Sequence, residues 1–275
     1  MKTLYVSDLD GTLFNSEKVV SQYSADMINR FIAQGGLFTI ATARMAFICD
    51  KKLGEININI PGIIMNGACL YSFREKKYMD VQAIEPSRIE EIEKILRDED
   101  HNAYMYAYKK NSLSIFYRSE PTDADSSYIG KYAQESCQEI RQVDSFAQTA
   151  SDRQIIFFAS TGSKEKIMRI WDKLKEITGI ESVVYSNIYN GLYCMDVFDQ
   201  KANKANALTR LKKLLQVDEI TAFGDNQNDI SMMHIADLCY APENALDEVK
   251  QMANEILESC DNDGVARFLQ RKYNL

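Results

Sequence analysis

The chain has 275 residues, of which 45% are hydrophobic, and its formal net charge is −8 at neutral pH. This length and apolar content are enough for one large domain or two smaller ones with buried cores. The negative charge and the lack of a dense lysine or arginine run argue against nucleic acid and anionic membranes as partners. We therefore expect a small-molecule partner, with the chain a monomer or a weak homodimer.

The first residues and the cysteine pattern predict a cytoplasmic protein. No apolar segment has the length of a signal-peptide core or a membrane span. The cysteines show no Cys-x-x-Cys spacing, so we interpret them as reduced core residues. They are Cys49, Cys69, Cys137, Cys194, Cys239 and Cys260. The two histidines, His101 and His234, have no second ligand at metal-binding spacing and are expected at the surface.

The first part of the chain alternates between short apolar strands and helices. Strands are predicted at 4–7, 37–41 and 63–66, and helices at 24–34 and 44–53. This order is typical of parallel strands joined by crossover helices, so the fold class is α/β with a doubly wound, Rossmann-like parallel sheet. Ligands of such sheets bind beyond the carboxyl ends of the strands.

The pattern changes after residue 67 and returns near residue 202. The intervening part predicts hairpins over 68–81 and 103–117, helices at 87–97, 126–137 and 163–177, and strands at 154–160, 180–185 and 192–197. From 202 onward the predicted helices are 202–215, 229–236, 245–253 and 264–270, with strands at 219–223 and 238–240. We therefore predict a discontinuous core domain of residues 1–81 and 191–275 and an inserted α+β cap domain of residues 82–190.

Two carboxylates stand where the first strand ends. Residues i and i+2 of an extended strand lie on the same face, roughly 6 to 7 Å apart, so Asp8 and Asp10 should project together. Such a pair repels unless a cation lies between the two or one holds a proton. Gly11 lets the chain turn away tightly. The motif indicates a metal or acid/base site, and the alternative is a solvated strand end followed by an Asp-Gly turn.

Three further polar clusters follow predicted strands or open helices. Thr42 precedes a helix, where a hydroxyl and free N–H groups hold a phosphate oxygen or simply cap the helix. Lys201 and Lys204 open another helix against its dipole, which indicates a nearby anion unless they are exposed. Asp225 and Asp229 lie four residues apart after a strand and a glycine. Acids buried together at one sheet edge are costly, so we expect a divalent cation there.

In these four clusters the chain resembles the haloacid dehalogenase superfamily of phosphohydrolases, and specifically the Cof-like branch with a large C2-type cap. The family motif Asp-x-Asp-Gly-Thr stands at 8–12, Thr-Ala-Arg at 42–44 and Gly-Asp-x-x-Asn-Asp at 224–229. Asn66-Gly67-Ala68 is similar to the family's turn ahead of the cap. The third-motif lysine is best matched by Lys204, although Ala205 replaces the usual glycine, so Lys201 remains an alternative.

The resemblance implies a Mg²⁺-dependent phosphatase that acts on a small phosphomonoester, such as a sugar phosphate or a phosphorylated cofactor. Asp8 would attack phosphorus to form an aspartyl-phosphate, and Asp10 would serve as general acid and then base. Asp8, the Asp10 backbone carbonyl and Asp225 would bind Mg²⁺. Asp229 would orient Lys204 or a metal-bound water.

Thr42 and Lys204 would hold the remaining phosphoryl oxygens. The resemblance also implies substrate contacts for Leu9, Thr12, Ala43, Arg44, Asn66, Gly67 and Asn228. Two other functions stay open, a phosphomutase of the same superfamily and a catalytically silent phosphate-binding regulator. The cap would act as a lid that sets specificity. Tyr104, Tyr106 and Tyr108 alternate on one face of a cap strand, where they pack against cap helices or stack on a substrate ring.

Overall fold

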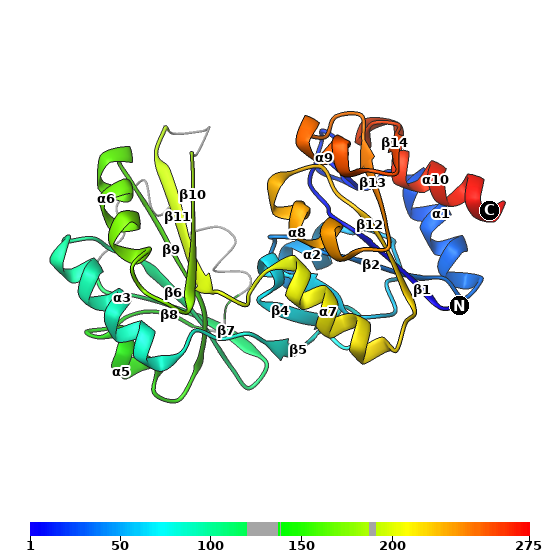
Figure 1. Cartoon of the computed structure of the whole chain (residues 1–275). Coiled ribbons are helices and arrows are strands. Elements are labelled where there is room, and N and C mark those ends of the chain that lie inside the picture. The colour runs from blue at the N-terminus through cyan, green and yellow to red at the C-terminus, as the bar shows by residue number, and fades with distance from the viewer. Residues whose placement is uncertain (120–136, 138, 187–190) are drawn as a thin grey trace. The chain divides into compact units, whose positions relative to one another are not determined.

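The computed structural model describes residues 1–119, 137, 139–186 and 191–275 (Figure 1). The chain forms two compact units. The core unit comprises Met1–Asp80 and Asn203–Leu275, and the inserted unit comprises Val81–Ala202. Among the described helices, none combines the length and the apolar character needed to span a bilayer.

The core unit is built on a five-stranded parallel sheet whose strands come from both parts of that unit. The strand order is β14, β13, β12, β1, β2, and every neighbouring pair is parallel. The strands are β1 (Thr3–Ser7), β2 (Leu37–Ile40), β12 (Glu219–Phe223), β13 (Leu238–Pro242) and β14 (Glu255–Leu257). The predicted doubly wound sheet is confirmed, although β14 was not predicted.

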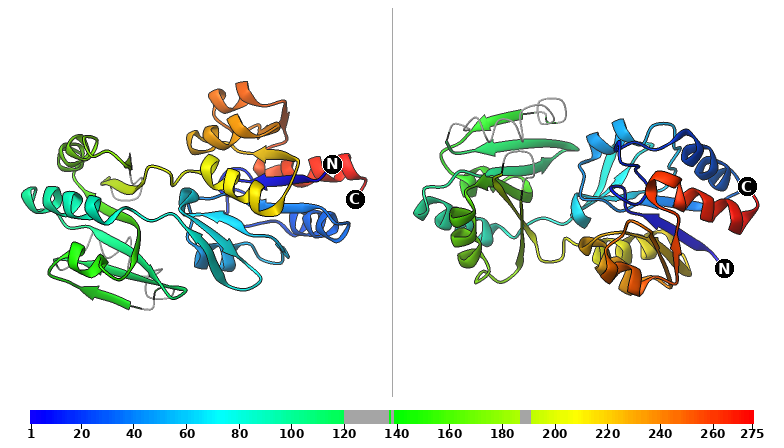
Figure 2. Two further views of the ribbon diagram at one scale, coloured as in Figure 1. Left: turned by 60° about the horizontal axis from the view of Figure 1, so that its bottom comes forward. Right: turned by 90° about the horizontal axis from the view of Figure 1, so that it is seen from above.

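Helices cover both faces of this sheet because successive side chains of β1 point in opposite directions. Leu4 and Val6 join an apolar cluster with residues of α7 and α8. Tyr5, between them, packs its ring against Phe31 of α1 and Tyr273 of α10. Helices α1 and α10 lie side by side in every view (Figure 1, Figure 2). The core helices are α1 (Gln22–Ala33), α2 (Ala46–Lys52), α7 (Lys204–Leu215), α8 (Gln227–Ile235), α9 (Asp247–Met252) and α10 (Gly264–Tyr273).

A small three-stranded sheet lies at the end of the first segment of the core unit, Met1–Asp80. Its order is β3, β4, β5, and a bridge between Ala41 and Ile63 connects it to the end of β2. The strands are β3 (Gly62–Ile64), β4 (Cys69–Ser72) and β5 (Lys77–Val81). The predicted strand 63–66 ends early, because Met65–Gly67 forms a 3₁₀ turn. β4 and β5 are the predicted hairpin.

The inserted unit contains a mixed six-stranded sheet covered by helices. The strand order is β10, β11, β9, β6, β7, β8, and among the pairs whose register is described only β7 and β8 are parallel. The strands are β6 (Tyr104–Lys109), β7 (Ser112–Tyr117), β8 (Glu139–Gln142), β9 (Gln154–Gly162), β10 (Ile180–Ser186) and β11 (Tyr193–Asp199). The described helices are α3 (Pro86–Asp98), α5 (Phe146–Ala150) and α6 (Lys164–Leu174). The helix predicted at 126–137 falls outside the described residues apart from Cys137.

The predicted domain boundary at residue 190 differs from the structure. Residues 191–202 were assigned to the core, but β11 pairs with β9 and β10 in the inserted unit. An apolar strand looks alike in either sheet, and only its long-range pairing decides which sheet it joins. β8 and α5 were not predicted either.

The alternating tyrosines of β6 lie on the face of the sheet opposite to the described helices α3, α5 and α6. Met105 and Ala107 belong to the apolar cluster that contains residues of α3, α5 and α6. Tyr106 points to the opposite face of the sheet, where its ring stacks on Phe157 with centroids 4.0 Å apart. Tyr104 and Tyr108 share that face by alternation. Packing against α3, α5 and α6 is therefore excluded for this row of side chains, whereas the helix predicted at 126–137 lies outside the described residues.

The cysteine and histidine predictions are mostly confirmed. Among the described residues no cysteine forms a disulfide, and all six except Cys137 are buried. His234 is exposed on α8. His101 is buried, contrary to the prediction. Its backbone N–H donates to the carbonyl of Leu96 at the end of α3, so the chain folds back there and carries the imidazole inward.

Glu93 is a buried acid on α3 that several donors surround. Its carboxylate accepts hydrogen bonds from Ser145 Oγ and from the Ala147 N–H, both at 2.9 Å, and from Arg97 at 2.7 Å. Burial alone would raise its pKa, but these donors hold the pKa below the usual value. The ionised carboxylate therefore stabilises the fold above the unfolded pKa of about 4.3. This contribution is lost as the pH falls through the lower folded pKa.

We expect Glu93→Gln to destabilise the inserted unit at pH 7 by about 1 to 3 kcal/mol. The difference from wild type should shrink below about pH 4, where wild-type Glu93 becomes neutral as well. The single tryptophan, Trp171, lies on α6 in this unit, so its fluorescence during urea unfolding gives the measurement. Glu90→Gln, an exposed change on the same helix, is the matched control. An equal loss at pH 7 and pH 3 would contradict the expectation.

Candidate active site

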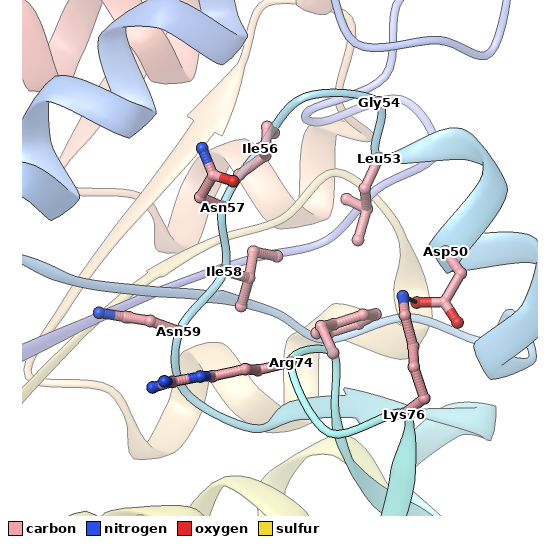
Figure 3. A pocket seen from close by; sticks show the side chains of 10 residues that line it. Asp50, Leu53, Gly54, Ile56, Asn57, Ile58, Asn59, Arg74 and Lys76 are labelled. Carbon is pink, nitrogen blue, oxygen red and sulfur yellow. Dashed lines mark hydrogen bonds and ion pairs between the residues drawn. The ribbon is translucent and has the colours of Figure 1, made fainter.

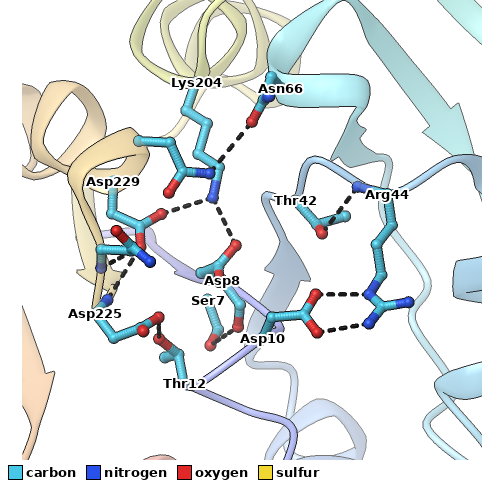
Figure 4. Close-up of polar contacts among 12 residues, drawn as sticks. Ser7, Asp8, Asp10, Thr12, Thr42, Arg44, Asn66, Lys204, Asp225 and Asp229 are labelled. Atoms are coloured by element: carbon cyan, nitrogen blue, oxygen red, sulfur yellow. Dashed lines mark hydrogen bonds and ion pairs between the residues drawn. The ribbon is translucent and has the colours of Figure 1, made fainter. Parts of the chain in front are cut away.

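Three buried carboxylates meet at the carboxyl ends of two neighbouring strands. Asp8 follows β1, Asp225 follows β12 after one glycine, and Asp229 lies in the first turn of α8. β1 and β12 are adjacent and parallel, and the Asp8 N–H donates to the carbonyl of Phe223 at 2.9 Å. One carboxylate oxygen of each acid lies within 4.8 Å of the others. We call Asp8, Asp225 and Asp229 the acid cluster (Figure 4).

Lys204 is the cation of this cluster. Its Nζ donates to Asp8 Oδ1 at 2.5 Å and to Asp229 Oδ1 at 2.6 Å, and the side chain is 1% exposed. Burial would lower its pKa, but the two carboxylates raise the pKa above its usual value. Lys204 is the first residue of α7, and the Asn203 side chain caps that helix by accepting the Asn206 N–H. Lys201, the alternative, is exposed and lies in the inserted unit.

Asp229 uses both of its oxygens to hold neighbours in place. Oδ1 accepts from Lys204, while Oδ2 accepts the backbone N–H groups of Asp225 and Asn226 at 3.0 and 3.1 Å. Asp229 and Asn226 form a capping box at the start of α8. This geometry fits the expectation that Asp229 orients Lys204.

The acid cluster has more negative charge than Lys204 can balance. Burial raises the pKa of Asp8 to about 8, with Asp229 adding to the effect and Lys204 opposing it. Burial also raises the pKa of Asp225 to about 6. Within the described part of the chain, Oδ2 of Asp8 and Oδ2 of Asp225 accept no hydrogen bond. Oxygen donors with uncompensated charge are what Mg²⁺ binds, so the residues present fit this ion.

The loop after β1 packs directly against Asp225. Gly11 has φ +83°, and a Cβ there would lie 2.4 Å from Asp225 Oδ2, so only glycine fits. Thr12 Oγ1 donates to Asp225 Oδ1 at 2.8 Å. The side-chain amide of Asn244 donates to the carbonyl of Gly11 at 2.7 Å. Thr12, predicted to contact substrate, therefore orients a carboxylate, and Asn244 is a supporting residue that the sequence analysis missed.

The Asp10 carboxylate does not project together with that of Asp8, contrary to the prediction from strand geometry. β1 ends at Ser7, and the turn that follows directs Asp10 away from the acid cluster. Its carboxylate accepts two hydrogen bonds from Arg44, at 2.6 Å from Nε and 2.5 Å from Nη2. The Arg44 N–H in turn donates to Thr42 Oγ1 at 3.2 Å. Each of the two aspartates thus has its own basic partner (Figure 4).

The other residues with an implied substrate contact divide by what they can offer. Leu9 is fully buried and Ala43 is exposed, and neither side chain has a hydrogen-bond donor. Only their backbone N–H groups could therefore bind a phosphate. Asn228 Nδ2 donates to Asn66 Oδ1 at 3.2 Å beside the acid cluster. The Cα of Gly67 lies against the backbone of Asn203, where a Cβ would find no room.

A cavity of about 440 Å³ lies elsewhere in the core unit, between the end of α2, the loop after it and the β4–β5 turn (Figure 3). Its walls include Leu53, Ile58 and Phe73, and the Lys76 ammonium pairs with Asp50 at 2.5 Å. None of the predicted site residues lines it. We therefore place the candidate site at the acid cluster.

Comparison with known proteins agrees with this geometry. A family model described as haloacid dehalogenase-like hydrolase matches residues 5–269. The chain belongs to the haloacid dehalogenase-like hydrolases. It is 26% identical over 284 residues to 5-amino-6-(5-phospho-D-ribitylamino)uracil phosphatase YwtE of Bacillus subtilis, with 96% of each protein covered. It is 24% identical over 271 residues to pyridoxal phosphate phosphatase YbhA of Escherichia coli, with 95% of each covered.

Solved structures of this family share the fold. A haloacid dehalogenase-like hydrolase from Bacteroides thetaiotaomicron has a TM-score of 0.78 at 22% identity, with 99% of this chain and 100% of that chain covered. The predicted family, a Cof-like haloacid dehalogenase phosphatase, is confirmed, as is the enzyme class of phosphoric monoester hydrolase. The acid cluster can therefore be interpreted in terms of phosphoryl transfer.

Proposed function

We propose that this haloacid dehalogenase-like hydrolase is a Mg²⁺-dependent phosphatase that hydrolyses a small phosphomonoester through an aspartyl-phosphate on Asp8. The observation that carries the proposal is the pairing of Asp8 with Lys204, next to Asp225, at the carboxyl end of the sheet. Lys204 occupies one oxygen of Asp8 and leaves Oδ2 without a hydrogen bond from the described residues. That oxygen is the candidate nucleophile.

In the first step the phosphoryl group is transferred from the ester oxygen of the substrate to a carboxylate oxygen of Asp8. Asp8 Oδ2 forms a bond to phosphorus while the bond to the ester oxygen breaks. Lys204 stays within reach of a phosphoryl oxygen, together with the Thr42 hydroxyl and the Asn228 amide. The positive charge of Lys204 and the hydrogen-bond donors of all three side chains offset the negative charge of the transferred group. The N–H groups of Leu9 and Ala43 complete this set.

Asp10 moves the proton in each step. It donates a proton to the leaving oxygen and then takes one from the water that hydrolyses the aspartyl-phosphate. Arg44 orients this carboxyl group through two hydrogen bonds in the free protein.

Mg²⁺ would be held by Asp8, Asp225 and the backbone carbonyl of Asp10. When bound, it supplies positive charge to the acid cluster and to the transferred phosphoryl group. Asp229 and Thr12 keep their positioning contacts to Lys204 and Asp225. The excess negative charge of the acid cluster supports this assignment.

The substrate class follows from the relatives and from the size of the inserted unit. YwtE is named for a phosphoribitylamino-uracil and YbhA for pyridoxal phosphate. We infer a sugar phosphate or a phosphorylated cofactor, with the inserted unit, Val81–Ala202, acting as the cap that closes over it and selects the leaving group. Tyr104, Tyr106 and Tyr108, on the face of the cap sheet opposite to α3, α5 and α6, are candidates for contacts with a ring.

A screen of phosphorylated metabolites that measures released inorganic phosphate tests this function. We expect turnover with Mg²⁺, loss of turnover with EDTA, and recovery when Mg²⁺ is added back. Phosphate release without a bisphosphate activator would exclude the phosphomutase. No release from any ester under these conditions would favour the silent phosphate-binding regulator and refute the proposal.

A further inference from the structure

The turn after β3 has a backbone conformation that only glycine adopts easily. Three successive residues, Met65, Asn66 and Gly67, have φ values of +51°, +53° and +97°. A left-handed backbone costs most residues other than glycine about 1 to 2 kcal/mol, as at Met65, whereas asparagine adopts it more readily. Such strain persists where the surroundings impose it, and it is concentrated at functional sites. We call residues 65–67 the left-handed turn.

Backbone hydrogen bonds fix the left-handed turn to the loop that carries Thr42. The Met65 N–H donates to the carbonyl of Arg44, and the Asn66 N–H donates to the carbonyl of Thr42, both at 3.0 Å. Met65 is 2% exposed, so its side chain anchors the turn in the core as well. The turn cannot relax without disturbing the loop at Thr42.

Contacts with α7 fix the other side of the turn. A Cβ on Gly67 would lie 2.2 Å from the carbonyl oxygen of Asn203, so the turn touches the backbone just before Lys204. Arg210 Nη2 donates to the carbonyl of Gly67 at 3.0 Å, and Arg210 Nε donates to Asp80 at 2.5 Å. The turn is therefore held between the loop at Thr42 and the start of α7.

Asn66 is the side chain that this turn presents beside the acid cluster (Figure 4). Its Oδ1 accepts a hydrogen bond from Nδ2 of Asn228 at 3.2 Å. Asn228 is exposed and precedes Asp229 on α8, and within the described residues its side chain has no other hydrogen bond. An exposed amide with several rotamers loses conformational entropy when it is fixed. The bond to Asn66 restricts those rotamers before any ligand arrives.

We propose that the left-handed turn is a positioning element, in which Asn66 orients the amide of Asn228 toward the transferred phosphoryl group. This inference rests on the proposed function, where Asn228 contacts a phosphoryl oxygen. Asn66 acts through Asn228 and is a positioning residue. The Asn228 side chain therefore loses its conformational entropy when the protein folds, and less is lost when the ligand binds.

Asn66→Gly separates this role from a structural one. Glycine adopts φ +53° without a Cβ penalty, so the variant removes the strain and the bond to Asn228 together. We expect a melting temperature equal to or above that of wild type. We also expect kcat/KM for p-nitrophenyl phosphate to fall about tenfold, with inhibition by inorganic phosphate weakened by about the same factor.

A double-mutant cycle tests whether Asn66 acts through Asn228. If it does, Asn66→Gly added to Asn228→Ala should cause little further loss of activity. Asn274→Gly is the matched control, because Asn274 has the same φ of +53° but lies exposed at the end of α10. It should leave the kinetics unchanged. Arg210→Ala should lower kcat/KM, as Asn66→Gly does. Lys213→Ala on the exposed face of α7 is its control and should leave kcat/KM unchanged.

Three outcomes would overturn the positioning role. The first is that Asn66→Gly keeps wild-type kinetics and wild-type inhibition by phosphate. The second is that its loss of activity only follows a lower melting temperature. The third is that the losses in the double variant are fully additive. Each of them requires an active wild-type enzyme. A wild-type protein that releases no phosphate from any ester would instead refute the proposed function, so the two failures are distinguishable.

Discussion

Asp8→Asn should abolish turnover and leave the fold intact. Asparagine keeps the shape of the side chain but cannot form the acyl phosphate, so we expect a loss in kcat on the order of 10⁴-fold or more. Released phosphate from p-nitrophenyl phosphate with Mg²⁺ gives the measurement. Asp26→Asn on the exposed face of α1 is the matched control. Retained turnover in a pure preparation would refute the nucleophile assignment.

The same variant should not lose stability when Mg²⁺ is absent. The pKa of Asp8 is raised from its usual value to about 8, so the folded protein favours the protonated form. Ionised Asp8 therefore costs stability as the pH rises from about 4 toward 8. Asparagine carries no charge at any of these pH values. With EDTA at pH 8, we expect Asp8→Asn to melt at or above the temperature of wild type.

Lys204→Ala should reduce both activity and stability, whereas Lys201→Ala should change neither by much. Without Lys204, Asp8 and Asp229 remain buried with no cation. Breaking a buried ion pair from one side costs about 3 to 5 kcal/mol. The lost charge at the phosphoryl group should lower kcat/KM by a factor on the order of 10³. Melting curves and phosphate release measure the two effects.

The comparison of the two lysine variants decides which of them belongs to the site. Both changes remove one ammonium group from the same stretch of chain, so general effects of charge are matched. A larger loss from Lys201→Ala would move the third motif to Lys201. Equal and small losses would show that the ion pairs of Lys204 are dispensable for catalysis.

The core of the fold could be predicted because local patterns determine it. β1, α1 and β2 follow from apolar runs and a Gly-Gly stop, and β12 with its glycine turn follows from the same reasoning. The sheet that an isolated strand joins depends on distant pairing, which explains the error at β11. β8 and β14, of four and three residues, were too short to give a periodic signal.

The acidic centre of the site could also be predicted, since its members follow adjacent parallel strands. Asp8 and Asp225 meet because β1 pairs with β12. The partner of Asp10 could not be predicted, because the direction of that side chain depends on the turn at Gly11. The pairing of Asn66 with Asn228 depends on a φ that no residue pattern specifies, and the support from Asn244 comes from a distant loop.

The position of β1 next to β12 has a consequence for synthesis of the chain on the ribosome. Strand β1 emerges early, but its neighbour appears only after residue 219 has been translated. Residues 81–202 form a contiguous unit, so they can fold while β1 and β2 still lack the other three strands of their five-stranded sheet. The nascent N-terminal segment therefore has one unpaired, apolar strand edge for most of translation, and such an edge is a template for pairing with other chains during that interval.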